Sequence, residues 1–229
     1  MEREIDLAQI SDGRRYGLND LVKADCAGCQ GCFSCCCGME DTILLDPYDM
    51  YRMAGGLQKT FDQLLEEQKI ELNLSGGLIL PNLRMEVDSG RCVFLNGTGR
   101  CSIHKIRPGI CRIFPLGRVY EEGKLSYFLQ IYECSKPGRA KIKVKKWIDT
   151  PEPKRYEEYL LRWHYFAKDL GTLLDEKADE ALTRQLSLYV LKQFFRTPFP
   201  EGRFYEAFEL RLRLAENFCG RLGLKGDHL

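Results

Sequence analysis

Apolar side chains recur at helical spacing through the last third of the chain. One stripe spans residues 156–174 at intervals of three and four residues, with Gly171 inside it, and two more span residues 182–194 and 204–222. Such spacing gathers the apolar side chains on one face of a helix. The pattern therefore predicts three helices with short connections, which is typical of a helical cap or a small bundle.

The pattern before residue 150 is less regular and mixes short elements. Residues 42–45 are predicted as a short strand. Asp46-Pro47 follows as a helix N-cap and first helical position, which predicts a helix to about Ala54, where Gly55-Gly56 ends it.

Further short elements follow along the same part of the chain. Thr60 and Gln63 have the spacing of a capping box, which predicts a second short helix to about Lys69. Alternating or continuous apolar runs predict two strands and a hairpin that turns at residues 121–124. These are residues 78–80, residues 84–87 and, for the hairpin, residues 119–132.

Pro151 and Pro153 separate the mixed part of the chain from the helical part. A proline disfavours helix at the residue before it and suits the first turn of a helix after it. The sequence thus predicts an α+β protein: a small, irregular, cysteine-rich domain at residues 1–150 with short strands and helices, followed by a helical region at residues 151–229. Because three apolar stripes need cover from water, we expect the helical region to pack on the first domain.

Overall charge and hydropathy exclude two classes of partner. The 229 residues carry 34 basic and 33 acidic side chains, a net charge of +1, which argues against binding to nucleic acid or an anionic membrane. No stretch reaches the ~20 apolar residues that span a bilayer. The first residues are acidic and amphipathic and lack the apolar core of a signal peptide, so we expect a cytoplasmic protein.

Cysteine is the residue type that changes this picture. The chain has eleven cysteines, and all but Cys219 lie between Cys26 and Cys134. The number is odd, and the cytosol keeps ordinary thiols reduced, so a disulfide scaffold is disfavoured. Clustered thiols in that compartment more often bind a metal or carry out redox chemistry.

The first cysteine block has the spacing of metal ligands. Cys29, Cys32, Cys35 and Cys36 form a C-x2-C-x2-C-C run, which lets thiolates from one tight turn reach one metal. Soft sulfur ligands select zinc or iron–sulfur clusters, and consecutive C-x2-C steps are similar to the run that grips a [4Fe–4S] cluster in ferredoxins. One turn does not usually complete a closed site, so further ligands are expected downstream.

A second block offers those ligands among rigid turn residues. The expected metal ligands are therefore eight thiols from the two blocks: Cys29, Cys32, Cys35, Cys36, Cys92, Cys101, Cys111 and Cys134. Cys26 and Cys37 are left open between ligand and spare thiol. Cys219 lies on an apolar helical stripe and is expected in the core, and His104 is expected to pack or hydrogen-bond rather than ligate.

The two blocks together resemble the YkgJ-like cysteine-cluster family, described as a zinc- or iron-chelating domain and named for its CxxCxxCC motif. The resemblance covers roughly residues 26–134 and includes Arg107-Pro108 and Phe114-Pro115 around Cys111. It implies metal binding. One member, the flagellin lysine N-methylase, is linked to an iron–sulfur cluster and to S-adenosylmethionine-dependent methyl transfer, an activity that the cysteines alone do not carry over.

Three functions follow from these residues. The first is a cytoplasmic metal-binding protein that holds a [4Fe–4S] cluster, which the number of thiols favours, or zinc, since two zinc sites would use the same eight thiols. The second is a metal-dependent enzyme that transfers a methyl group to a protein side chain. The third is a zinc-stabilised module that binds a protein client or partner. An open coordination position favours the enzyme, and a closed four-thiolate site favours the module.

Overall fold

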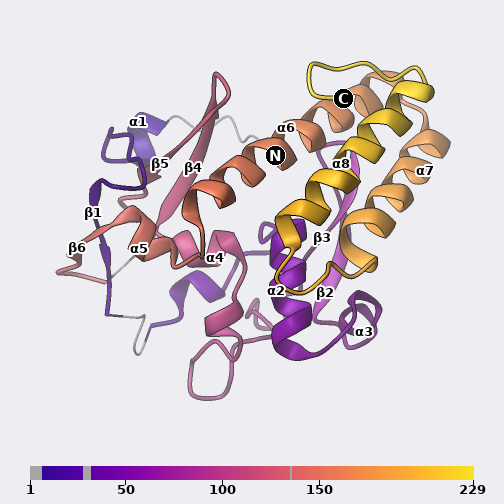
Figure 1. The fold of residues 1–229 in the computed structure, drawn as a ribbon. Helices are drawn as coiled ribbons and strands as arrows, with labels where there is room; N and C mark the ends of the chain where they lie inside the picture. Colours follow the sequence, from indigo (N-terminus) through magenta and orange to yellow (C-terminus); the bar gives the residue numbers. More distant parts are fainter. Residues whose placement is uncertain (1–6, 28–31, 135) are drawn as a thin grey trace. The chain divides into compact units, whose positions relative to one another are not determined.

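The computed structural model describes residues 7–27, 32–134 and 136–229 (Figure 1). The chain divides into two compact units. The cysteine unit comprises residues up to Ile43 together with Leu83–Leu161, and the helical unit comprises Leu44–Asn82 together with Arg162–Leu229. Short antiparallel strands occur beside helices, and the chain ends in helices, so the predicted α+β class is confirmed. The proposed division at residue 150 stays a prediction.

The cysteine unit combines two small antiparallel ribbons with short helices. Strand β1 pairs with β6, and β4 pairs with β5. The elements are α1 (Leu7–Ile10), β1 (Leu21–Asp25), the 3-10 turns η1 (Ser34–Cys36) and η2 (His104–Ile106), α4 (Gly109–Ile113), β4 (Leu116–Glu121), β5 (Lys124–Leu129), β6 (Ala140–Lys143), α5 (Val144–Ile148) and the beginning of α6 (Pro153–Lys177).

The β4–β5 hairpin confirms the hairpin expected from the sequence. Glu121 pairs with Lys124, so the loop has two residues, Glu122 and Gly123. Both have positive φ, 49° and 72°. Two positive φ values define the turn whose twist matches that of the flanking strands, and glycine favours it at the second position.

A buried tyrosine pair lies in the core of the cysteine unit. Tyr127 of β5 and Tyr156 of α6 are 0% and 1% exposed. Arg112 of α4, which is also buried, donates from Nη2 to the Tyr156 hydroxyl at 3.1 Å. Trp147 of α5 donates from Nε1 to the carbonyl of Ile113 at 3.0 Å. These contacts fix α4, which carries Cys111, against α5 and α6.

Two predicted strands are reduced to single bridges. In residues 42–45 only Leu44 forms a bridge, to Asn82. The N–H of Leu45 donates to the carbonyl of Pro81, but a proline has no N–H and cannot donate a second hydrogen bond in return. In residues 84–87 Met85 bridges to Cys92, and the chain then turns back through Gly90. Prolines and turn residues override the apolar runs at these positions, so both strand predictions are wrong in extent.

The helical unit contains the three helices predicted after residue 153. Its elements are α2 (Pro47–Leu57), α3 (Phe61–Glu66), the paired strands β2 (Ile70–Ser75) and β3 (Leu78–Leu83, except its last residue), the rest of α6, α7 (Glu180–Leu191), the π-helical turn η3 (Lys192–Arg196) and α8 (Phe204–Arg221). Helices α7 and α8 run side by side (Figure 1), and Tyr189 stacks on Phe218 between them with ring centroids 4.4 Å apart.

Helix caps in this unit follow the sequence closely, but one helix end does not. The capping boxes at Asp46/Asp49 and Thr60/Gln63 are both formed. Helix α2, however, runs through Gly55-Gly56 to Leu57, three residues past its expected end. The residue in left-handed conformation that ends it is Gln58. Glycine weakens a helix by about 1 kcal/mol, which is too little to end one by itself.

Helix α6 continues through Gly171 without a break, and this glycine has a packing role. It lies against the turn between β2 and β3, where a Cβ on Gly171 would collide with the carbonyl of Gly76. The glycine inside this helix is therefore the residue that lets the β2–β3 hairpin approach the helix backbone.

Candidate metal centre

The two cysteine blocks lie side by side in the cysteine unit. The N–H of Cys92 donates to the carbonyl of Cys36 at 2.8 Å, and the N–H of Gly38 donates to Gly90 at 2.8 Å. Cys37 forms an antiparallel bridge with Arg91. The chain thus joins segments more than fifty residues apart in sequence through their backbones, as expected if both blocks serve one region of the molecule.

Thiols from both blocks raise one another's pKa. For Cys35 the hydrogen bond with Cys36 is the main cause, followed by burial and by the neighbouring thiols of Cys36 and Cys32. The pKa of Cys92 is raised first by burial and then by Cys101 and other thiols. Several thiolates crowded into one place repel one another, and a bound cation reverses that repulsion.

The pKa of Cys101 is also raised, first by burial. A backbone hydrogen bond and the charge of Arg107 act in the opposite direction, toward the thiolate. Arg107 likewise acts on Cys35, where it lowers the pKa against the other causes. This guanidinium therefore favours ionised sulfur in both blocks.

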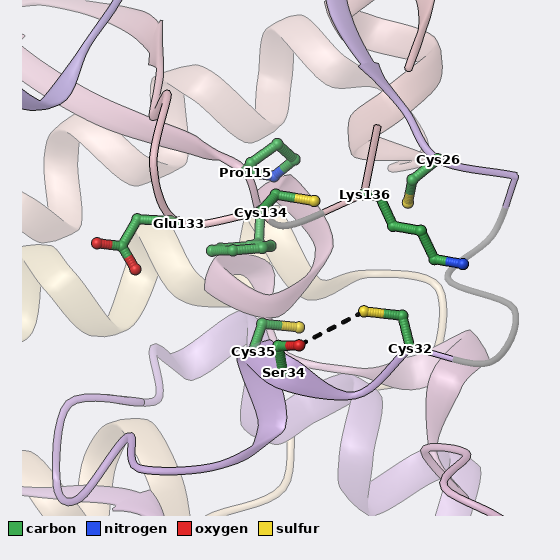
Figure 2. Close-up of a pocket in the computed structure, with 9 residues that line it drawn as sticks. Cys26, Cys32, Ser34, Cys35, Pro115, Glu133, Cys134 and Lys136 are labelled. Atoms are coloured by element: carbon green, nitrogen blue, oxygen red, sulfur yellow. Dashed lines mark hydrogen bonds between the residues drawn. The ribbon is translucent and has the colours of Figure 1, made fainter. Parts of the chain in front are cut away.

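A small cavity brings four thiols together (Figure 2). It is ≈ 20 Å³ in volume, and its walls include Cys26, Cys32, Cys35 and Cys134. Cys32 and Cys35 come from one stretch of chain, and Cys26 and Cys134 from two others. In Figure 2 their sulfur atoms turn toward the space between them. Cys32 Sγ lies 3.7 Å from Ser34 Oγ. The volume suits a body the size of a water molecule or a single metal ion.

The rest of the cavity wall is largely apolar. Phe114 and Pro115 form part of it directly after α4, joined by a cis peptide bond. Lys136 brings a positive charge to the wall, and Glu133 contributes its side chain, with the carboxylate turned away from the sulfur atoms in Figure 2. Phe114-Pro115, noted as a rigid pair in the sequence, thus borders the thiols.

The candidate ligands fall into three placements. Cys32, Cys35 and Cys134 line the cavity, and Cys36, Cys92 and Cys101 lie where the two blocks meet. Cys111 is half-buried in α4 and is not among the described residues that line the cavity. Cys29 lies outside the described residues. Cys219 is 1% exposed in α8, in the core as predicted.

His104 and Arg107 form a pair beside the second block. Arg107 Nη1 lies 2.8 Å from His104 Nε2, and because a guanidinium only donates, Nε2 accepts. Burial, and then the charge of Arg107, lowers the pKa of His104. A neutral imidazole whose Nε2 is already engaged agrees with the hydrogen-bonding role expected for this residue.

The donor set fits a thiophilic metal, although its described members are not gathered at one point. Within residues 7–27, 32–134 and 136–229, no three His, Cys, Asp or Glu side chains lie close enough together to hold an ion. The thiols line a shared space instead, and metal sites commonly close only when the ion binds. Sulfur donors of this number select zinc, copper(I) or iron–sulfur clusters over hard cations such as magnesium.

Comparison with known proteins identifies this region. Residues 28–135 match the family model described as "CxxCxxCC: Putative zinc- or iron-chelating domain". Residues 28–135 of the chain are thus similar to a CxxCxxCC domain. This confirms the resemblance seen in the sequence. The chain is also similar to an uncharacterized protein of Methanocaldococcus jannaschii, MJ0661, at 26% identity over 171 residues, which cover 72% of this chain and 85% of the relative.

No solved structure matches the chain. The match supports metal binding by residues 28–135, and it begins after Cys26. Cys26 and Lys136 are the lining residues that lie outside it. The spacing of Cys26, three residues before Cys29, was the one sequence signal that pointed to it. In the described part of the chain, no helix has the length and apolar character needed to cross a bilayer.

Proposed function

We propose that this chain is a cytoplasmic metalloprotein whose CxxCxxCC domain holds its metal through thiolates of the two cysteine blocks. The observation that carries the proposal is the cavity at which thiols from separate segments converge, bordered by Phe114-Pro115. The proposed ligands are the eight thiols Cys29, Cys32, Cys35, Cys36, Cys92, Cys101, Cys111 and Cys134. Between the described cysteines there is no disulfide.

The first candidate for the metal is a [4Fe–4S] cluster, and the spacing of the first cysteine block supports it. Consecutive C-x2-C steps are similar to the run that binds such a cluster in ferredoxins. When bound, such a cluster supplies electron transfer or a site for substrate at an iron without a protein ligand. The chain's own residues hold the cluster, keep water from it with Phe114 and Pro115, and favour ionised sulfur through Arg107.

The second candidate is zinc, and the size of the cavity supports it. A space of ≈ 20 Å³ accommodates one ion, while a cluster requires the surrounding segments to separate. Zinc in a closed thiolate site is structural and contributes directly to folding. This reading agrees with a protein-binding module. The exposed lysines of β6, Lys141 and Lys143, offer such a module a basic face for an acidic protein partner.

Anaerobic purification followed by elemental analysis, sulfide assay and visible absorption tests this function. We expect at least one equivalent of tightly held metal per chain. Iron with equimolar sulfide, together with broad absorption of visible light, identifies an iron–sulfur cluster. Zinc without such absorption identifies a zinc ion bound by thiolates. A chain that is fully folded and holds neither metal after anaerobic handling contradicts the proposed function.

A further inference from the structure

We propose that Cys26 is a further ligand of the metal centre and acts together with Cys32, Cys35 and Cys134. This inference rests on the proposed function and extends it to a residue outside the matched domain, which begins at residue 28. The sequence left Cys26 open between ligand and spare thiol. Its position in the fold favours the ligand.

The β1–β6 ribbon sets where Cys26 lies. Asp25, the last residue of β1, pairs with Ala140, the first residue of β6. Cys26 therefore follows the end of β1 at the same end of the ribbon where the chain enters β6. The segment that enters is the one that carries Cys134 and Lys136. Two cysteines more than a hundred residues apart in sequence are thereby held at one end of a two-stranded ribbon.

A local turn fixes the backbone just after Cys26. The Asp25 carboxylate accepts a hydrogen bond from the N–H of Ala27 at 3.0 Å, and Ala27 adopts a positive φ of 54°. An aspartate that bonds to the backbone two residues on forms a compact turn. The Cys26 thiol thus projects from a turn held by the ribbon and its neighbouring carboxylate.

The four thiols lie around a single cavity. Cys26, Cys32, Cys35 and Cys134 all line the same cavity, and in Figure 2 their sulfur atoms face its interior. Cys32 and Cys35 share one stretch of chain, whereas Cys26 and Cys134 come from two others. Four thiolates are the complete set for tetrahedral zinc and the usual set for an iron–sulfur cluster.

Charge and polarity in the cavity suit a thiolate-bound metal. Four thiolates around a divalent ion leave two net negative charges, and Lys136 at the wall brings a positive charge to offset them. Phe114 and Pro115 exclude water from the other side.

Cys37 provides the matched control. Like Cys26 it is half-buried and next to the motif, but it pairs with Arg91 through its backbone and does not line the cavity. Wild type, Cys26→Ser, Cys37→Ser and Cys32→Ser are purified anaerobically as full chains. Iron, sulfide and zinc per chain are then measured before and after competition with a chelator of known affinity.

Cys26→Ser and Cys32→Ser should both lose metal to the chelator at least 100-fold more readily than wild type, because a lost ligand exceeds the ~10–100-fold cost of a lost outer hydrogen bond. Cys37→Ser should match wild type. Cys26→Ser with wild-type retention, while Cys32→Ser is emptied, overturns the inference and leaves the proposed function standing. Wild-type protein without metal overturns both.

A second measurement on the wild-type chain covers the case in which Cys26→Ser does not fold. Alkylation of single cysteines is followed by peptide mass spectrometry in the metal-loaded and chelator-stripped protein. Bound metal should slow alkylation of Cys26 at least tenfold, in step with Cys134, while the rate at Cys37 stays the same. Equal rates at Cys26 with and without metal overturn the inference.

Discussion

Cysteines in this chain differ in their surroundings far more than in their spacing. Cys35 and Cys101 lie among other thiols near Arg107, which favours their ionised form. Cys219 lies on the buried face of α8 and is 1% exposed. Burial raises the pKa of its thiol to about 11. The same side chain is thus a candidate ligand in one place and an inert hydrophobic residue in another.

Alkylation of Cys219 tests this contrast at the scale of one residue. At pH 8 a thiol with a pKa of about 11 is almost entirely neutral, and the thiolate is the nucleophile. We expect Cys219 in the native protein to stay unmodified by iodoacetamide at pH 8, and to react when urea unfolds the chain. Peptide mass spectrometry measures both.

Two results would count against this reading of Cys219. Rapid alkylation in the native protein would mean that α8 opens readily at its C-terminal end. A loss of metal in Cys219→Ser would mean that the core thiol takes part in the site, whereas we expect its metal content to equal that of wild type.

The sequence predicted which residue type forms the site, but it did not predict which cysteines meet in the fold. The family motif and the C-x2-C spacing indicated a metal-binding region, which the family model supports over residues 28–135, because spacing within one turn is local information. They could not decide on Cys26, since its place at the cavity depends on the pairing of Asp25 with Ala140 across more than a hundred residues.

At the scale of elements, local signals predicted helices well and strands poorly. The N-cap expected at Asp46 and the capping box expected at Thr60 both formed, because they involve only neighbouring residues. Strand β2 was missed: its leucines Leu72 and Leu74 face solvent, while Asn73 donates inward to the buried Asn82 at 2.8 Å. A half-buried strand is recognised by apolar side chains on its inner face that alternate with polar ones on its outer face. In the middle of β2 the polar side chains face inward and the leucines face outward, so this pattern is reversed.

Gly171 provides an element-scale prediction about how α6 and the β2–β3 turn fit together. A Cβ at Gly171 meets backbone atoms of Gly76, which cannot rotate away as a side chain would. We expect Gly171→Ala to lower the free energy of unfolding by about 1–3 kcal/mol despite the higher helix propensity of alanine. Thermal unfolding should show this as a lower Tm, by roughly 2–4 °C for each kcal/mol.

Gly55→Ala is the matched control for that substitution. Gly55 also lies inside a helix, α2, but a Cβ there meets nothing within 4 Å. Alanine should therefore raise the stability by about 0.5–1 kcal/mol through helix propensity alone. Equal shifts of the same sign in both variants would contradict the close packing at Gly171.

At the scale of the whole molecule, metal binding should be coupled to the stability of the cysteine unit. The candidate ligands come from η1, the loop around Cys92 and Cys101, α4 and the segment after β5. These segments have little regular structure of their own, and a metal that joins them crosslinks chain regions far apart in sequence. Where a site forms only in the folded protein, the free energy of binding adds to the free energy of folding.

Cys32→Ser and Cys111→Ser test that coupling from the two cysteine blocks. Each substitution should lower the metal content and the Tm together, because each removes a proposed ligand from a different segment. At a free metal concentration of 100 times Kd, binding stabilises the native state by about 2.7 kcal/mol, so a fully emptied variant should lose a contribution of that order. Removing metal from wild type with a chelator should lower its Tm toward that of the variants.

The decisive comparison is between the two variants after chelation. If metal is the source of the difference, wild type, Cys32→Ser and Cys111→Ser should unfold at similar temperatures once all are stripped, since a half-buried serine is a small change in packing. A Cys111→Ser protein that keeps full metal and a wild-type Tm, beside an empty Cys32→Ser protein, would remove α4 from the centre. The metal would then be held by the cavity thiols and the first block, and Phe114-Pro115 would serve only to shape the wall around it.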